Sequence, residues 1–81
     1  MKESAVYADF EIISETMPEQ CARGGCVWVD TVARHAVSGE IVYTCIEPFG
    51  GAGTVQVSER IAVGEALEHA RDSLRHRLGR R

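Results

Sequence analysis

The hydrophobic period of this chain changes once, and that change limits the possible folds more than any other feature. Before residue 62, four segments alternate apolar with polar residues or are rich in β-branched and aromatic side chains, both typical of strands. After it, Leu67, Ala70, Leu74 and Leu78 recur at spacings of three and four, as on one face of a helix. Strands followed by a single helix predict the α+β class.

The expected strands cover residues 5–15, 26–37, 40–47 and 54–61. Ser38-Gly39 between the second and third segments predicts a two-residue hairpin turn, because glycine readily adopts a positive φ. This register places three pairs on shared faces of the sheet: Ala36 with Ile41, Arg34 with Tyr43, and Val32 with Cys45. It places His35 and Cys45 on opposite faces.

The last segment, "GEALEHARDSLRHRLG" at residues 64–79, predicts the helix. Its acidic residues come early and its arginines late, which suits the helix dipole, and Gly79 is a suitable stop. Glu68 and Asp72 are spaced to pair with Arg71 and Arg75. The expected fold is a single α+β domain over residues 1–81: a small antiparallel sheet in the order β-β-β-β-α, with the C-terminal helix packed on one face.

The 81 residues carry a formal net charge of −3, and this charge is uneven. Residues 1–60 have four basic and nine acidic groups (−5), whereas residues 61–81 have five basic and three acidic groups (+2). An acidic body argues against nucleic acid as the main ligand, since phosphates need a basic surface. No secretory leader or apolar segment of about 20 residues is visible, so we expect a cytoplasmic protein with no membrane partner.

The three cysteines raise the question of a metal site or a disulfide. An odd number of thiols favours the reduced state. Cys21 and Cys26 flank "ARGG", which indicates a turn before a strand. Two alternatives stay open: a transient disulfide between these cysteines, or a small zinc-binding protein in which a helix histidine completes the ligands. We expect no metal and no cofactor.

No catalytic constellation stands out in the sequence. A catalytic cysteine needs a nearby base, and no motif fixes a histidine against a thiol. The "FGGAGT" segment lacks the lysine of a phosphate-binding loop and does not open a helix. We therefore predict that the chain is not an enzyme.

Three groups of residues are candidates for binding a partner. The first strand presents an acidic stripe of Tyr7, Asp9, Glu11 and Glu15, which can steer a basic partner, and the first three are the candidate contacts. Phe49 lies near the expected hairpin tip, where it can anchor a partner or tuck under the loop. The C-terminal arginines form the basic cluster: Arg77, Arg80 and Arg81.

Both faces of the expected central hairpin carry apolar residues, and one helix cannot cover both. One face would present Trp28, Val32, Ile41 and Tyr43, and the other Val27, Val29, Val42 and Ile46. The sequence therefore predicts a second covering surface, from a homodimer or from a protein partner.

These observations predict a non-enzymatic protein-binding module. By size and architecture the chain resembles small inhibitors of phages and mobile elements, including anti-CRISPR proteins, which implies that it occupies the surface of a host protein complex. A strand followed by "GEALEHARDSL" is similar to the strand-helix unit of HicB-type antitoxins over about twenty residues. That likeness implies an alternative, a regulator that contacts nucleic acid through the basic C-terminus.

Overall fold

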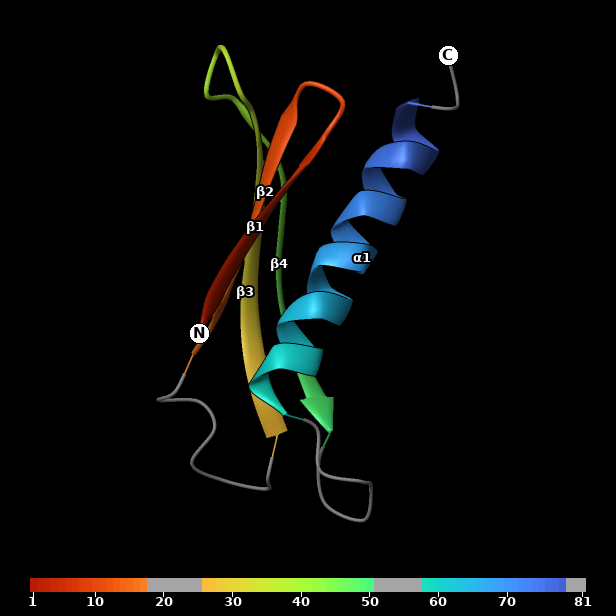
Figure 1. Cartoon of the computed structure of the whole chain (residues 1–81). Helices are drawn as coiled ribbons and strands as arrows, with labels where there is room; N and C mark the ends of the chain where they lie inside the picture. The colour runs from red at the N-terminus through yellow and green to blue at the C-terminus, as the bar shows by residue number, and fades with distance from the viewer. Residues whose placement is uncertain (18–25, 51–57, 79–81) are drawn as a thin grey trace.

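The fold was analysed in a computed structural model, which describes residues 1–17, 26–50 and 58–78. Four strands precede one helix: β1 (Lys2–Tyr7), β2 (Phe10–Thr16), β3 (Cys26–His35), β4 (Ile41–Gly50) and α1 (Glu59–Leu78). All neighbouring strands pair antiparallel in the order β1-β2-β3-β4. The helix lies along one face of this sheet (Figure 1). The predicted α+β class, with four strands followed by one helix, is confirmed.

The first two strands come from a segment that we predicted to be a single strand. Residues 5–15 bend back at Ala8 and Asp9, and Tyr7 pairs with Phe10 across this turn. Ala8 has a φ of 53°, which is a left-handed conformation that costs a residue with a Cβ about 1–2 kcal/mol. The turn contains no glycine or proline, and Asp9, a residue common in turns, was its one signal in the sequence.

The register of the central hairpin also differs from the prediction. Five residues, 36–40, connect β3 to β4, and the His35 Nδ1 atom accepts hydrogen bonds from the Val37 and Ser38 amides. Gly39 has the positive φ expected of it, 76°. Arg34 pairs with Ile41 while Ala33 pairs with Tyr43, which leaves Val42 as the extra residue of a β-bulge.

This bulge reverses the faces that we predicted for the rest of β4. A shift of one residue turns every side chain of a strand to the other face. Cys45 lies opposite Thr31 rather than Val32, and Tyr43 faces the helix. The prediction that His35 and Cys45 occupy opposite faces is therefore wrong. His35 lines a pocket beneath the end of α1, and Cys45 contacts a glutamate that bonds to the same helix.

The helix begins five residues earlier than expected, at Glu59. Ser58 precedes it and acts as its N-cap, because its Oγ accepts a hydrogen bond from the Ile61 amide and its carbonyl accepts one from Ala62. The predicted strand over residues 54–61 is therefore wrong at its end, and residues 54–57 lie outside the described residues. The helix stripe predicted from the sequence is correct at Ala70 and Leu74, which are buried.

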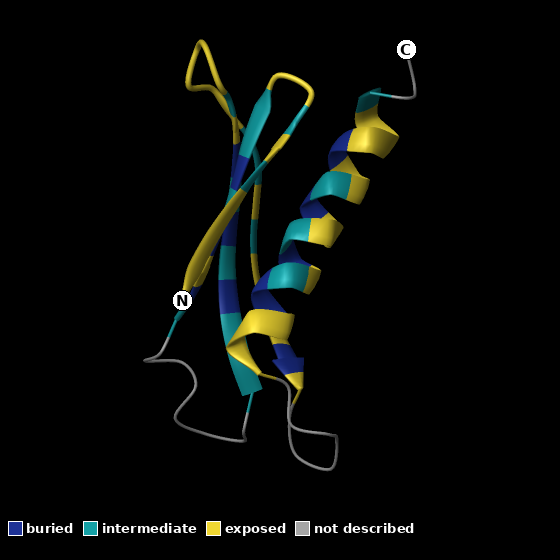
Figure 2. Ribbon diagram, viewed as in Figure 1, coloured by how far each residue is buried: buried dark blue, intermediate teal, exposed yellow. Residues whose placement is uncertain are grey.

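The core between sheet and helix consists of two apolar clusters (Figure 2). The cluster at the start of α1 contains Val29, Phe49, Ala62, Val63 and Ala66. The cluster toward its end contains Ile12, Ala33, Ala70 and Leu74. Three of the five buried helix residues are alanines, so the helix backbone lies close to the sheet.

A line of polar side chains, here called the polar row, crosses the sheet between these clusters. Ser14, Thr31 and Cys45 lie opposite one another on β2, β3 and β4. Ser14 is 0 % and Thr31 1 % exposed, and their hydroxyl oxygens are 2.8 Å apart in a hydrogen bond. Because each hydroxyl satisfies the other, the row crosses the core without leaving a buried polar group unpaired.

Candidate protein-binding surface

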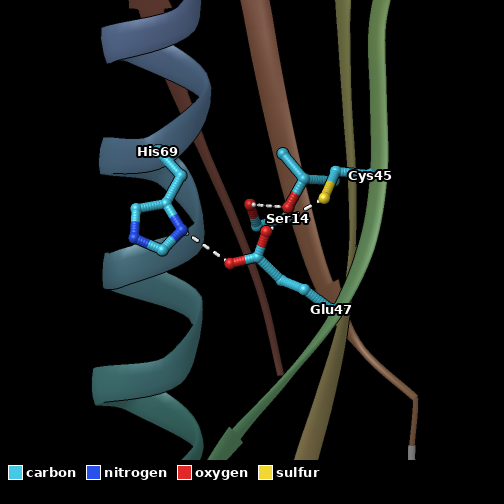
Figure 3. Close-up of polar contacts among 5 residues, drawn as sticks. Ser14, Cys45, Glu47 and His69 are labelled. Atoms are coloured by element: carbon cyan, nitrogen blue, oxygen red, sulfur yellow. Dashed lines mark hydrogen bonds and ion pairs between the residues drawn. The ribbon is translucent and has the colours of Figure 1, made fainter.

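The polar row continues to the helix through Glu47 and His69 (Figure 3). The Cys45 thiol donates to Glu47 Oε2 over 2.9 Å, and His69 Nδ1 lies 2.6 Å from Glu47 Oε1. The His69 ring also stacks on Phe49, with ring centroids 5.8 Å apart. This cluster therefore fixes α1 to the edge strand β4. The sequence analysis missed it, although Cys45 and Glu47 are two apart and so share a face in any register.

The arrangement of Cys45, Glu47 and His69 in this cluster does not activate the Cys45 thiol as a nucleophile. Glu47 stands between Cys45 and His69, whereas a nucleophilic cysteine is activated by a base in direct contact with its sulfur. The hydrogen bond to Glu47, together with burial, raises the pKa of Cys45 above its ordinary value of 9.0. The thiol is thus held protonated, and protonated thiols are poor nucleophiles and poor metal ligands.

The described residues contain no group of three or more His, Cys, Asp or Glu side chains arranged to hold a metal ion. Cys26 is half-buried and lies 3.8 Å from the Gly50 carbonyl oxygen. Cys21 lies outside the described residues, so both the disulfide and the zinc alternative keep the status of predictions.

A pocket of about 290 Å³ lies between the last turn of the helix and the hairpin end of the sheet. Its lining combines apolar side chains with three polar ones: Phe10, Val42, Leu74, Leu78, His35, Glu40 and Arg77. Ligand pockets usually measure about 300–1,000 Å³. This pocket is therefore at the lower limit of size for a small-molecule site.

The acidic stripe predicted on the first strand is not a single surface. Tyr7 is half-buried and packs against the cluster of Ile12 and Leu74 beneath the helix. Asp9 lies in the turn, where its carbonyl accepts a hydrogen bond from the Ala36 amide. Glu11 and Glu15 lie on the face away from the helix. The stripe is dispersed because the predicted strand is a hairpin.

The structure places Phe49 within β4 rather than at a hairpin tip, and the loop under which it was expected to tuck lies outside the described residues. Its side chain is 7 % exposed and belongs to the core cluster around Val29 and Val63. In this position it contributes to the packing of α1, and its ring offers almost no surface to a partner.

The described part of the basic C-terminus is engaged within the chain. Arg71 pairs with Glu68 and Arg75 with Asp72, as the helix spacing predicts. Arg77 donates a hydrogen bond of 2.9 Å to the Val42 carbonyl oxygen. Arg80 and Arg81 lie outside the described residues.

The face of the sheet opposite α1, here called the open face, is not covered by any described helix or strand (Figure 1). Strand register assigns five aliphatic side chains to it: Val6, Ile13, Val32, Ile41 and Ile46. Val6 is 72 %, Ile41 60 % and Ile46 56 % exposed. The prediction that both sheet faces are apolar is correct, although the bulge exchanges Tyr43 and Ile46 between them.

Charged residues lie among these aliphatic side chains on the open face. Arg34 donates two hydrogen bonds to Glu11 Oε1, of 2.9 and 2.6 Å. This ion pair lies between Val6 and Ile41, because the four residues stand side by side on neighbouring strands. The other charged residues that the register assigns to this face are Lys2, Glu15 and Asp30.

Comparison with known proteins gives no match to any family model, curated protein or solved structure. Within the described residues, no helix is both long and apolar enough to cross a bilayer.

Proposed function

We propose that this chain is a non-enzymatic protein-binding module whose open face contacts a partner protein. The observation that carries the proposal is the exposure of Val6, Ile41 and Ile46 on a sheet face that no described element covers. Exposed aliphatic side chains grouped on one face mark an interaction surface more often than scattered ones do.

The dimensions of the open face limit the strength of such a contact. Four strands about 4.8 Å apart and roughly seven residues long, at about 3.3 Å per residue, form a face of roughly 400 Å² in projection. A standard interface buries about 800 Å² on each partner. The contact must therefore use most of the open face, and we expect it to be transient or to extend beyond the sheet.

Occupation of a partner's surface is also how small phage-type inhibitors act, so the inhibitor prediction fits this surface. The polar cluster supports the non-enzymatic part, because it holds the Cys45 thiol protonated and bonded to Glu47. We do not extend the proposal to nucleic acid, because Arg71, Arg75 and Arg77 each bond to another group of the chain.

Two isoleucines provide a matched test. Ile46 on the open face and Ile61 on the helix are 56 % and 55 % exposed, so an arginine at either position disturbs the core equally little. Tagged wild-type, Ile46→Arg and Ile61→Arg proteins would each be used to capture binding proteins from a lysate of the native host. We expect one partner, retained by wild-type and Ile61→Arg but lost with Ile46→Arg. Equal capture by Ile46→Arg and wild-type would refute the assignment of the open face.

A further inference from the structure

The two edge strands of the sheet differ in how far they can pair with another strand. An edge strand presents a row of unpaired N–H and C=O groups, and proteins usually block such rows with proline, bulges or capping side chains. In this chain the edge strands are β1 and β4.

Strand β4 is blocked at both ends. The Trp28 carbonyl accepts a hydrogen bond from the Met17 amide, so the backbone N–H and C=O of Trp28 point away from β4. Its partner on β4 is Pro48, whose backbone groups therefore point outward, away from β3. Proline has no N–H to offer there. At the other end, Val42 is the bulge residue, and its carbonyl already accepts the Arg77 guanidinium.

Strand β1 has no proline, bulge or side-chain cap within the described residues, and the edge device that it carries at an outward position is the charge of Lys2. The Met1 carbonyl accepts a hydrogen bond of 2.9 Å from the Thr16 amide, which sets the alternation of this strand. The backbone N–H and C=O groups of Glu3, Ala5 and Tyr7 therefore also point toward β2. Those of Lys2, Ser4 and Val6 point outward, away from the sheet. All three are exposed, and none has a hydrogen bond from these groups to another described residue.

We infer that β1 is the pairing edge for a second copy of this chain. The two β1 strands run antiparallel about Ser4, so that each Ser4 lies opposite the Ser4 of the other copy and each Lys2 lies opposite Val6. Each opposed pair exchanges two backbone hydrogen bonds. The result is a continuous sheet of two copies that uses the edge and leaves the open face free, so it does not depend on the function proposed above.

Charge complementarity supports this register. Val6 is 72 % exposed, and the Lys2 stem of the second copy covers it. Glu11 lies next to Val6 in the same cross-strand line, and Arg34 bonds only to its Oε1 atom, which leaves Oε2 for the Lys2 ammonium. A pairing centred on Glu3 instead would place two glutamates directly opposite each other, which is unfavourable.

The test is the mass of the full chain, measured by sedimentation equilibrium over a wide range of concentration. We expect the mass to rise from 8.9 kDa toward twice that value as the concentration increases. Ser4→Pro removes an outward N–H and no bond to β2, so it should keep the fold and weaken the dimer by about tenfold or more, the factor that corresponds to 1.4 kcal/mol. Ser4→Ala keeps the N–H and should dimerise like wild-type.

Two further variants keep the inference open to refutation. Thr44→Pro removes an outward N–H from β4, so it should leave the β1 dimer unchanged. Lys2→Glu should weaken the dimer by repulsion from Glu11, even if Ser4→Pro fails to fold. A monomer at every concentration would overturn the inference. The inference would also be overturned if a folded Ser4→Pro variant or the Lys2→Glu variant dimerised as strongly as wild-type. Loss of the dimer with Thr44→Pro alone would overturn it too.

Discussion

Removal of one hydroxyl from the polar row should cost more than removal of both. Ser14 and Thr31 are 0 % and 1 % exposed, and each hydroxyl has the other as its hydrogen-bond partner. In Thr31→Val the Ser14 hydroxyl would stay buried without this partner, and in Ser14→Ala the Thr31 hydroxyl would. A buried polar group left unsatisfied costs about 1–3 kcal/mol.

The double variant Ser14→Ala/Thr31→Val removes the unpaired group along with the hydrogen bond. Replacing both partners by apolar groups of similar shape is nearly neutral. We therefore expect the double variant to be destabilised by less than either single variant, with a coupling energy of about 1–3 kcal/mol or more. The effect is large for a chain of 81 residues, whose free energy of unfolding is roughly 4–12 kcal/mol in total.

Urea unfolding followed by circular dichroism measures these free energies for the wild-type, the two single variants and the double variant. Ser4→Ala and Thr44→Val are matched controls, because both side chains are exposed, and each should change stability by less than about 0.5 kcal/mol. If the two single effects add within about 0.5 kcal/mol in the double variant, the hydroxyls are not each other's essential partners and the reasoning fails.

Three further predictions concern the turn, the core and the response to pH. Ala8→Gly should raise the free energy of unfolding by about 1 kcal/mol in the same urea assay, because glycine adopts the φ of 53° without a Cβ clash. Leu74→Ala should lower it by about 2–5 kcal/mol, seen as a reduced thermal midpoint, because Leu74 is 2 % exposed in its cluster. The hydrogen bond to Glu47 raises the pKa of Cys45 above 9.0, and burial, followed by the bond to Cys45, raises the pKa of Tyr43 from 10.0 to about 12. The folded chain holds both protons more tightly than the unfolded chain, so stability should be full below pH 9 and fall as the pH rises toward 12; Tyr43→Phe should flatten the part of this fall above pH 10.

The class of fold was predictable from the sequence because it depends on periodicity, which needs no knowledge of register. The boundaries of the strands and of the helix were not predictable, because they depend on local contacts. The Ala8-Asp9 turn has no glycine or proline, and its one common turn residue, Asp9, was read as a strand position because Tyr7 and Phe10 continue the alternation of a single strand. Ser58 was a readable signal for the start of the helix, since serine is a favoured N-cap, but the alternation of the preceding residues concealed it.

The candidate surface was predictable only in part. Aliphatic residues on both faces of the central hairpin indicated an uncovered face, and the structure confirms one. The residues that occupy it depend on the bulge at Val42, which stands next to a five-residue loop capped by His35. A side-chain cap on a loop is a tertiary detail that a two-residue turn signal at Ser38-Gly39 cannot convey.

The protection of β4 has a consequence for the size of any assembly. A subunit with two open edges could add further subunits at both ends and grow into a fibre without a defined length. Pro48 and the Arg77 contact to Val42 close one end, so pairing through β1 consumes the growing edges of both subunits and stops at two. A proline and one arginine contact on a single strand thus separate a finite particle from an open-ended polymer.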